Sequence, residues 1–150
     1  MDLSHSFVGI ATENARREGV TVDFRHGDAA DLPFPAESFD VVVCQAAFKN
    51  FPKPVAALDE MHRVLRPGGT AVIDDMNHDV TRHDIAREVA AMGLGRRDAA
   101  LTRLALAGLR RRAATSVQFE RLVAASAFRV CSISTEGIGM RVRLTRPPVD

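Results

Sequence analysis

The chain has 150 residues, of which 46% are hydrophobic and 26% charged, and its formal net charge is +1. This length suffices for one domain with a single core and is too short for two ordinary ones. The composition excludes a disordered chain, and no run approaches the roughly 18 apolar residues of a membrane-spanning helix. We therefore expect residues 1–150 to form a single cytoplasmic domain with no membrane partner.

The first 24 residues predict a helix followed by a strand. Phe7 and Ile10 fall at helical spacing behind Ser4, and Gly19 marks the end of the helix. Between residues 20 and 24, apolar and polar side chains alternate. This alternation predicts a half-buried strand near a sheet edge.

Residues 39–75 predict a strand, a helix and a second strand. The run "FDVVVC" (39–44) is continuously apolar after its first acid, which is typical of a strand covered on both faces. Pro54 opens the helix, and Pro67-Gly68-Gly69 is expected to end it. The run "TAVIDD" (70–75) predicts another strand covered on both faces.

The second half of the chain predicts three helices and a β-hairpin. The helices are expected over residues 79–92, over about 98–112 and, capped by Ser116, over 117–126. Strands over 128–134 and 139–145 are joined by a turn at Glu136-Gly137. The whole order predicts an α/β fold with a mostly parallel sheet and a C-terminal antiparallel hairpin.

Two motifs make the sequence recognisable. One is Gly27-Asp28-Ala29 with the following "DLPFPAESFD", and the other is "RVLRPGG" at residues 63–69. In this order and spacing they resemble the class I methyltransferases that use S-adenosylmethionine (SAM). Within that family, the chain is most similar to the small-molecule branch that includes ubiquinone and menaquinone methyltransferases. The resemblance implies a Rossmann-like sheet, SAM as cofactor and a small-molecule methyl acceptor.

The resemblance also assigns cofactor contacts to residues at strand ends: Asp2, Gly27, Asp28, Ala29, Cys44 and Gln45. An acid at Asp28 can accept a hydrogen bond from the adenine amine, and hydrogen bonds to charged groups contribute about 1.5–3 kcal/mol. Gly27 lets the backbone approach the ligand. Asp2 takes the place of the acid that holds the ribose hydroxyls, and Cys44 and Gln45 face the methionine part of SAM. The alternatives are a frayed N-terminus for Asp2 and a turn-capping acid for Asp28.

Asp75 and His78 are the candidate catalytic residues, because each follows the second apolar strand closely. Methyl transfer depends mainly on positioning the donor and the acceptor. A base is needed only where the acceptor loses a proton. The stretch "HDVTRHD" suggests metal binding, but His78 and His83 do not share a helix face, so we expect no metal site.

The second half of the chain is basic. Residues 76–150 carry a net charge of +6 and residues 1–75 a net charge of −5. Seven arginines form the basic zone: Arg96, Arg97, Arg103, Arg110, Arg111, Arg112 and Arg121. They can serve an anionic substrate or be a solvated helical face. The scarcity of aromatic residues argues against a platform for single-stranded nucleic acid, although a nucleic-acid-binding module that uses these arginines stays a third, less favoured hypothesis.

No GxGxG motif occurs in the chain. The resemblance places the Gly-rich SAM loop and the first strand of the sheet before Asp2, so both are expected to be missing. The strand over 39–44 would then have an unpaired edge, and the free backbone groups of such an edge tend to pair with another chain. The sequence therefore leaves two main possibilities open. One is a SAM-dependent methyltransferase, impaired if the loop is absent. The other is a non-catalytic remnant that binds a partner or forms a homodimer over the open edge.

Overall fold

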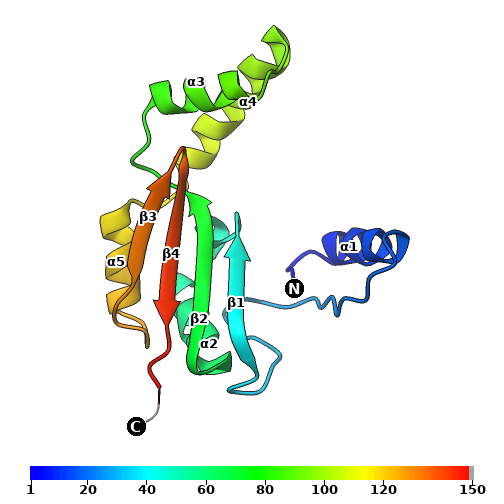
Figure 1. Cartoon of the computed structure of the whole chain (residues 1–150), viewed down its shortest axis with the longest axis vertical. Helices are drawn as coiled ribbons and strands as arrows, with labels where there is room; N and C mark the ends of the chain where they lie inside the picture. Colours follow the sequence, from blue (N-terminus) through cyan, green and yellow to red (C-terminus); the bar gives the residue numbers. More distant parts are fainter. Residues whose placement is uncertain (149–150) are drawn as a thin grey trace.

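The computed structural model describes residues 1–148 of the chain, and its centre is a sheet of four strands. The strands are β1 (Phe39–Gln45), β2 (Leu65–Met76), β3 (Ser132–Glu136) and β4 (Gly139–Thr145), in the order β1-β2-β4-β3. β1 and β2 pair in parallel, whereas β4 is antiparallel to both β2 and β3. Three strands thus share one direction and β4 opposes them (Figure 1). The predicted α/β fold, with its mostly parallel sheet and its C-terminal hairpin, is confirmed.

The helices begin close to the positions that the sequence predicts. Within residues 1–148 they are α1 (His5–Arg17), α2 (Pro54–Val64), α3 (Arg82–Ala91), α4 (Arg96–Arg110) and α5 (Ser116–Ala124), with a 3₁₀ turn η1 (Phe48–Asn50). Ser4 caps α1, and Thr81 and Thr115 form capping boxes with the third residues of α3 and α5. Ser116 is the first residue of α5 and not its cap, because the Thr115 hydroxyl accepts the amide hydrogen of Gln118.

The main core lies between one face of the sheet and helices α2 and α5. Leu58 of α2 and Phe119 of α5 pack with Ile73, Val142 and Leu144 of the two central strands, and all five are buried. A smaller cluster joins Ile85 and Val89 of α3 to Met76, Val80 and Ala113. This second cluster fixes the α3–α4 pair above the carboxyl ends of β1 and β2 (Figure 1).

The opposite face of the sheet is open. Val41 and Val43 of β1 are 58% and 64% exposed. The prediction that both faces of β1 are covered is therefore wrong for residues 1–148. The continuous apolar run correctly predicts a strand, but it does not indicate whether other segments of the protein cover each face of that strand.

The expected strand over residues 20–24 does not form. Asp2 and His26 make an isolated parallel bridge, and residues 20–25 are extended without strand pairing. Helix α1 buries none of its residues and lies beyond the free edge of β1 (Figure 1). A strand needs a hydrogen-bonded neighbour, and within residues 1–148 this segment has none in the sheet.

The "RPGG" motif forms the irregular first part of β2, where the register against β1 shifts. Helix α2 already ends at Val64, ahead of the glycines that are expected to stop it. Gly68 has a φ of +81°, and a Cβ at Gly69 would lie 2.8 Å from the carbonyl oxygen of Arg66 and 3.0 Å from that of Asp40. Only glycine fits such a close backbone approach. The motif therefore sets the start of β2 against β1.

Candidate functional site

A cavity of about 800 Å³ lies at the carboxyl ends of β1 and β2. Its floor comes from the residues that end these two strands and from the β3–β4 turn, and its far wall comes from α3 and α4. In an open α/β sheet, the carboxyl ends of the strands are where ligands bind. Of the residues predicted from the sequence, the cavity brings together Gln45 and Asp75.

A polar row crosses the open face of the sheet at this cavity. Gln45, Asp74, Arg141 and Ser134 are in register on the four strands. Arg141 donates two hydrogen bonds to the carboxylate of Asp74, at 2.6 and 2.9 Å. The guanidinium holds the pKa of Asp74 below its usual value, so this acid stays ionised. Sequence reasoning missed both members of this pair.

A buried ion pair forms the other polar part of the floor. The ammonium of Lys49 lies 2.8 Å from Oδ1 of Asp75, and the two side chains are only 6% and 4% exposed. Asp75 also accepts the backbone amides of Lys49 and Met76, at 2.9 and 2.7 Å. Lys49 was not predicted, although it is one of two lysines in a chain rich in arginine and follows the end of a strand.

Cys44 points into the core between the sheet and the helices, on the side away from Gln45. Its thiol is buried, and burial raises the pKa of Cys44 to about 11. The thiol is therefore protonated at neutral pH and faces apolar neighbours. A cofactor contact by Cys44, which the resemblance predicts, would have to use its backbone.

His78 does not line the cavity. Its Nδ1 lies 2.9 Å from the carbonyl oxygen of Arg110, and Nε of Arg110 donates to the carbonyl of His78 at 2.9 Å. These two contacts join the segment after β2 to the end of α4. The geometry therefore supports a role for His78 in holding α4 above the cavity.

The N-terminal candidates form a second group. The amide of Gly27 donates to the carbonyl of Asp2 at 3.1 Å, which sets these two residues side by side. Oδ1 of Asp28 accepts the amide of Ala30 at 2.9 Å. Within residues 1–148, Oδ2 of Asp28 and the amide of Ala29 make no hydrogen bond. One free acceptor beside one free donor matches the hydrogen-bonding edge of adenine.

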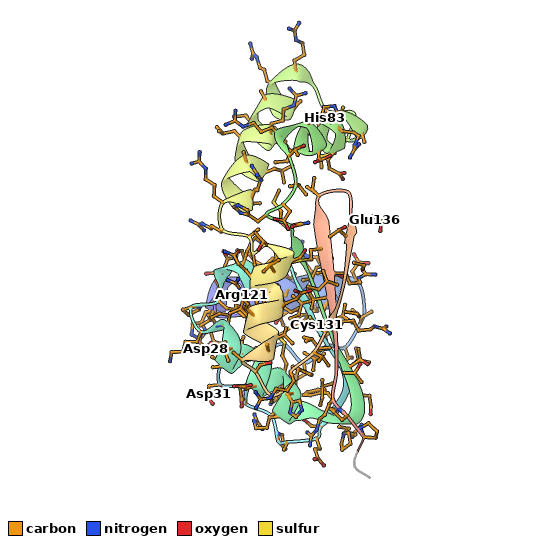
Figure 2. All side chains as sticks on the ribbon, turned by 90° about the vertical axis from the view of Figure 1, so that its left-hand side faces the viewer. Asp28, Asp31, His83, Arg121, Cys131 and Glu136 are labelled. Carbon is orange, nitrogen blue, oxygen red and sulfur yellow. The ribbon has the colours of Figure 1, made fainter. Side chains whose placement is uncertain are left out.

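The two groups are not brought together in the structure. Asp2, Gly27, Asp28 and Ala29 do not line the cavity. In Figure 2, Asp28 lies well away from Glu136, which is at the cavity rim on the β3–β4 hairpin. The reason is that segment 1–38 meets the sheet through a loop and not through strand pairing.

That loop is anchored to α2 by a residue of the second motif. Arg63 forms an ion pair with Glu60 and donates to the carbonyls of Leu32 and Phe34, at 3.0 and 2.8 Å. Glu60 in turn accepts the amide of Leu32 at 2.8 Å. The two motifs that make the sequence recognisable are thus in direct contact.

Comparison with known proteins agrees with this geometry. Residues 1–73 match the model of a methyltransferase domain. The first half of the chain is therefore similar to methyltransferase domains. A 2-phytyl-1,4-naphtoquinone methyltransferase of Synechococcus elongatus is 36% identical over 78 residues, which are 51% of this chain and 34% of that protein. A demethylmenaquinone methyltransferase of Deinococcus radiodurans is 39% identical over 72 residues, which are 48% of this chain and 30% of that protein.

The likeness in structure extends further along the chain. A SAM-dependent methyltransferase from Aquifex aeolicus superposes with a TM-score of 0.71 at 15% identity, over 96% of this chain and 65% of that one. This likeness shows the fold. The chain spans about a third of the length of the two curated relatives. The match to the methyltransferase-domain model ends at residue 73, so α3, α4 and the hairpin lie outside that match.

Two further properties concern metals and membranes. Residues 1–148 contain no group of three or more His, Cys, Asp or Glu side chains placed to hold a metal ion. No helix in this part of the chain combines the length and the apolar character needed to cross a bilayer.

Proposed function

We propose that this chain transfers a methyl group from SAM to a small-molecule acceptor of the quinone type. The observation that carries the proposal is the cavity at the carboxyl ends of β1 and β2. The names of the curated relatives support a quinone-type acceptor. The partly apolar lining supports it too, since Leu106, Leu109 and Ile138 face the same space as the polar row.

The residues present fit the adenosine half of the cofactor by the chemistry of their donors and acceptors. Oδ2 of Asp28 would accept from the adenine amine, and the amide of Ala29 would donate to a ring nitrogen. Asp2, with its Oδ1 already holding the amide of Ser4, would offer Oδ2 to the ribose. Bound SAM would supply an electrophilic methyl group on its sulfonium.

The chain's own residues would then position the acceptor. Gln45 and the Asp74–Arg141 pair offer hydrogen bonds at the cavity floor, and Leu106 and Leu109 of α4 give the facing wall an apolar surface. Asp75 and His78 remain predictions as proton acceptors. Asp75 is favoured because it lines the cavity, but an acceptor proton would reach its carboxylate only past the ammonium of Lys49.

Calorimetric titration of residues 1–150 with S-adenosylhomocysteine tests the cofactor half of the proposal. Asp28→Ala should weaken binding about tenfold or more, as expected for one hydrogen bond to a charged group. Asp28→Asn separates the loss of charge from the loss of the turn, because its amide oxygen still accepts from Ala30. Asp31→Ala is the matched control, since Asp31 lies exposed in the same loop. Absence of binding by the folded chain would contradict the proposal.

An alternative function rests on a different observation, the exposed edge strand β1. We propose as this alternative that two copies of the chain pair through β1 and form a non-catalytic homodimer. Antiparallel pairing centred on Val42 would set Val41 of one copy beside Val43 of the other and shield part of each side chain from water.

Light scattering distinguishes the two functions. The homodimer should dissociate on Val43→Lys, whereas Val130→Lys, an equally exposed valine elsewhere, should leave it intact. A dimer that does not bind S-adenosylhomocysteine supports the alternative. A monomer at all concentrations contradicts it.

A further inference from the structure

Helix α4 carries a line of exposed side chains that the core does not explain. Arg97, Leu101, Leu104, Gly108 and Arg111 follow one another at alternating spacings of four and three residues, which makes them neighbours along one helix face. All five are exposed, and the two leucines are 67% and 73% exposed. We call this line the leucine–arginine stripe.

The other side of α4 is already occupied. Ala99 and Leu106 pack against the cluster that holds α3, and Leu106 and Leu109 line the cavity. The stripe is therefore a second apolar surface on a helix whose first apolar surface is in use. Leucines this exposed, and adjacent, mark a contact surface more often than isolated ones do.

The charge around the stripe limits what can cover it. Residues 96–112 contain six arginines and a single acid, Asp98. Within residues 1–148, none of these arginines takes part in an ion pair. A second copy of α4 would bring like charges together and is disfavoured. Nucleic acid would satisfy the arginines but offers no apolar surface to the leucines.

A second feature of the same region also combines cationic and apolar groups, as a partner with both anionic and apolar parts would require. Arg96 and Arg103 line an opening of about 420 Å³ between α3 and α4, together with Leu94 and Val89. Cationic and apolar groups again lie side by side there. Figure 2 shows that the α3–α4 pair projects beyond the sheet, with side chains directed into solvent.

We infer that the leucine–arginine stripe of α4 docks on an anionic lipid surface. Arg97 and Arg111 contact the headgroups at the two ends of the helix, while Leu101 and Leu104 enter the boundary with the acyl chains. A helix that lies on a bilayer needs no spanning length. The expectation that the chain has no membrane partner rests on that length alone, so surface docking replaces it.

Vesicle co-sedimentation tests this inference with the full chain. The protein should pellet with vesicles of equal parts phosphatidylcholine and phosphatidylglycerol, and far less with phosphatidylcholine alone. Binding should fall as salt rises. Leu101→Gln with Leu104→Gln should weaken binding to the anionic vesicles at least about tenfold, since partial burial of two leucines is lost. Glutamine keeps the helix propensity, so the fold should persist.

The controls distinguish binding through the leucine–arginine stripe from nonspecific adsorption to vesicles. Val130→Gln removes an equally exposed apolar side chain away from α4 and should leave vesicle binding unchanged. Equal binding to neutral and anionic vesicles, or wild-type binding by the double leucine variant, would overturn the inference. So would binding to duplex DNA without binding to vesicles. Vesicle binding would stand whether or not the chain transfers a methyl group.

Discussion

The buried pair of Lys49 and Asp75 gives the sharpest stability prediction, through the substitution Lys49→Met. Methionine has nearly the volume of the lysine stem, so packing around η1 is kept while the charge is lost. The carboxylate of Asp75 retains its two backbone donors but loses the ammonium 2.8 Å away. The carboxylate is then left without its counter-charge in a site where only 4% of its side chain reaches solvent.

The expected cost is large for a single substitution. Removing one partner of a buried ion pair destabilises a protein by about 3–5 kcal/mol, because the other charge is left uncompensated. Domains of this size unfold with about 5–15 kcal/mol, so the variant loses a large share of its stability. Asp75→Asn added to Lys49→Met removes the stranded charge. The double variant should therefore recover about 1–3 kcal/mol relative to the sum of the single effects.

Urea unfolding at neutral pH measures these free energies. The matched control is Arg66→Met, which breaks the pair between Arg66 and Asp40, whose side chains are 50% and 77% exposed. Exposed pairs contribute about 0–1 kcal/mol, so this control should change little. A Lys49→Met variant as stable as the control, or strictly additive single and double effects, would refute the reasoning.

Four further predictions concern other parts of the chain. Gly69→Ala should destabilise the fold by about 1–3 kcal/mol, since the new Cβ meets two backbone oxygens that cannot move away. Gly9→Ala should stabilise α1 by up to about 1 kcal/mol, since it meets nothing there; urea unfolding compares the two. With its pKa near 11, Cys44 should react with a thiol reagent at pH 8 about two hundred times more slowly than a free cysteine. Its rate should rise about tenfold per pH unit, and a rate that is flat with pH would contradict this. Burial lowers the pKa of His62, so its contribution to stability is present above the unfolded pKa of about 6.5 and is lost as pH falls from there through the lower pKa of the folded state. His62→Gln should flatten the fall in unfolding free energy over that range, and an unchanged slope would exclude His62 as its cause.

Several features could be predicted from the sequence because their signals are local. Caps, turn glycines and apolar spacing predict the helices and the hairpin to within a few residues. The family resemblance, and no local signal, assigned Asp2 and Gly27 to strand ends, and the structure brings their backbones into contact. The sequence predicted Pro67-Gly68-Gly69 only as the end of a helix, whereas the close approach of Gly69 to two carbonyl oxygens is known from the structure.

The tertiary structure alone decided which side chains meet. Lys49 and Asp75 are 26 residues apart, and Asp74 and Arg141 are 67 apart. The pair of Asp74 and Arg141 depends on the register between β2 and β4, and the pair of Lys49 and Asp75 on the packing of η1 against the end of β2. No local pattern encodes either arrangement.

Exposure also depended on the tertiary structure. Val43 and Ile73 are both apolar, yet Val43 is exposed and Ile73 is buried. A sequence states that a residue is apolar, whereas only the packed chain determines what covers it. For this reason the sequence by itself determined the order of elements and the resemblance from which the adenosine-side candidates are predicted, and the fold determined the cavity floor and the exposure of the stripe on α4.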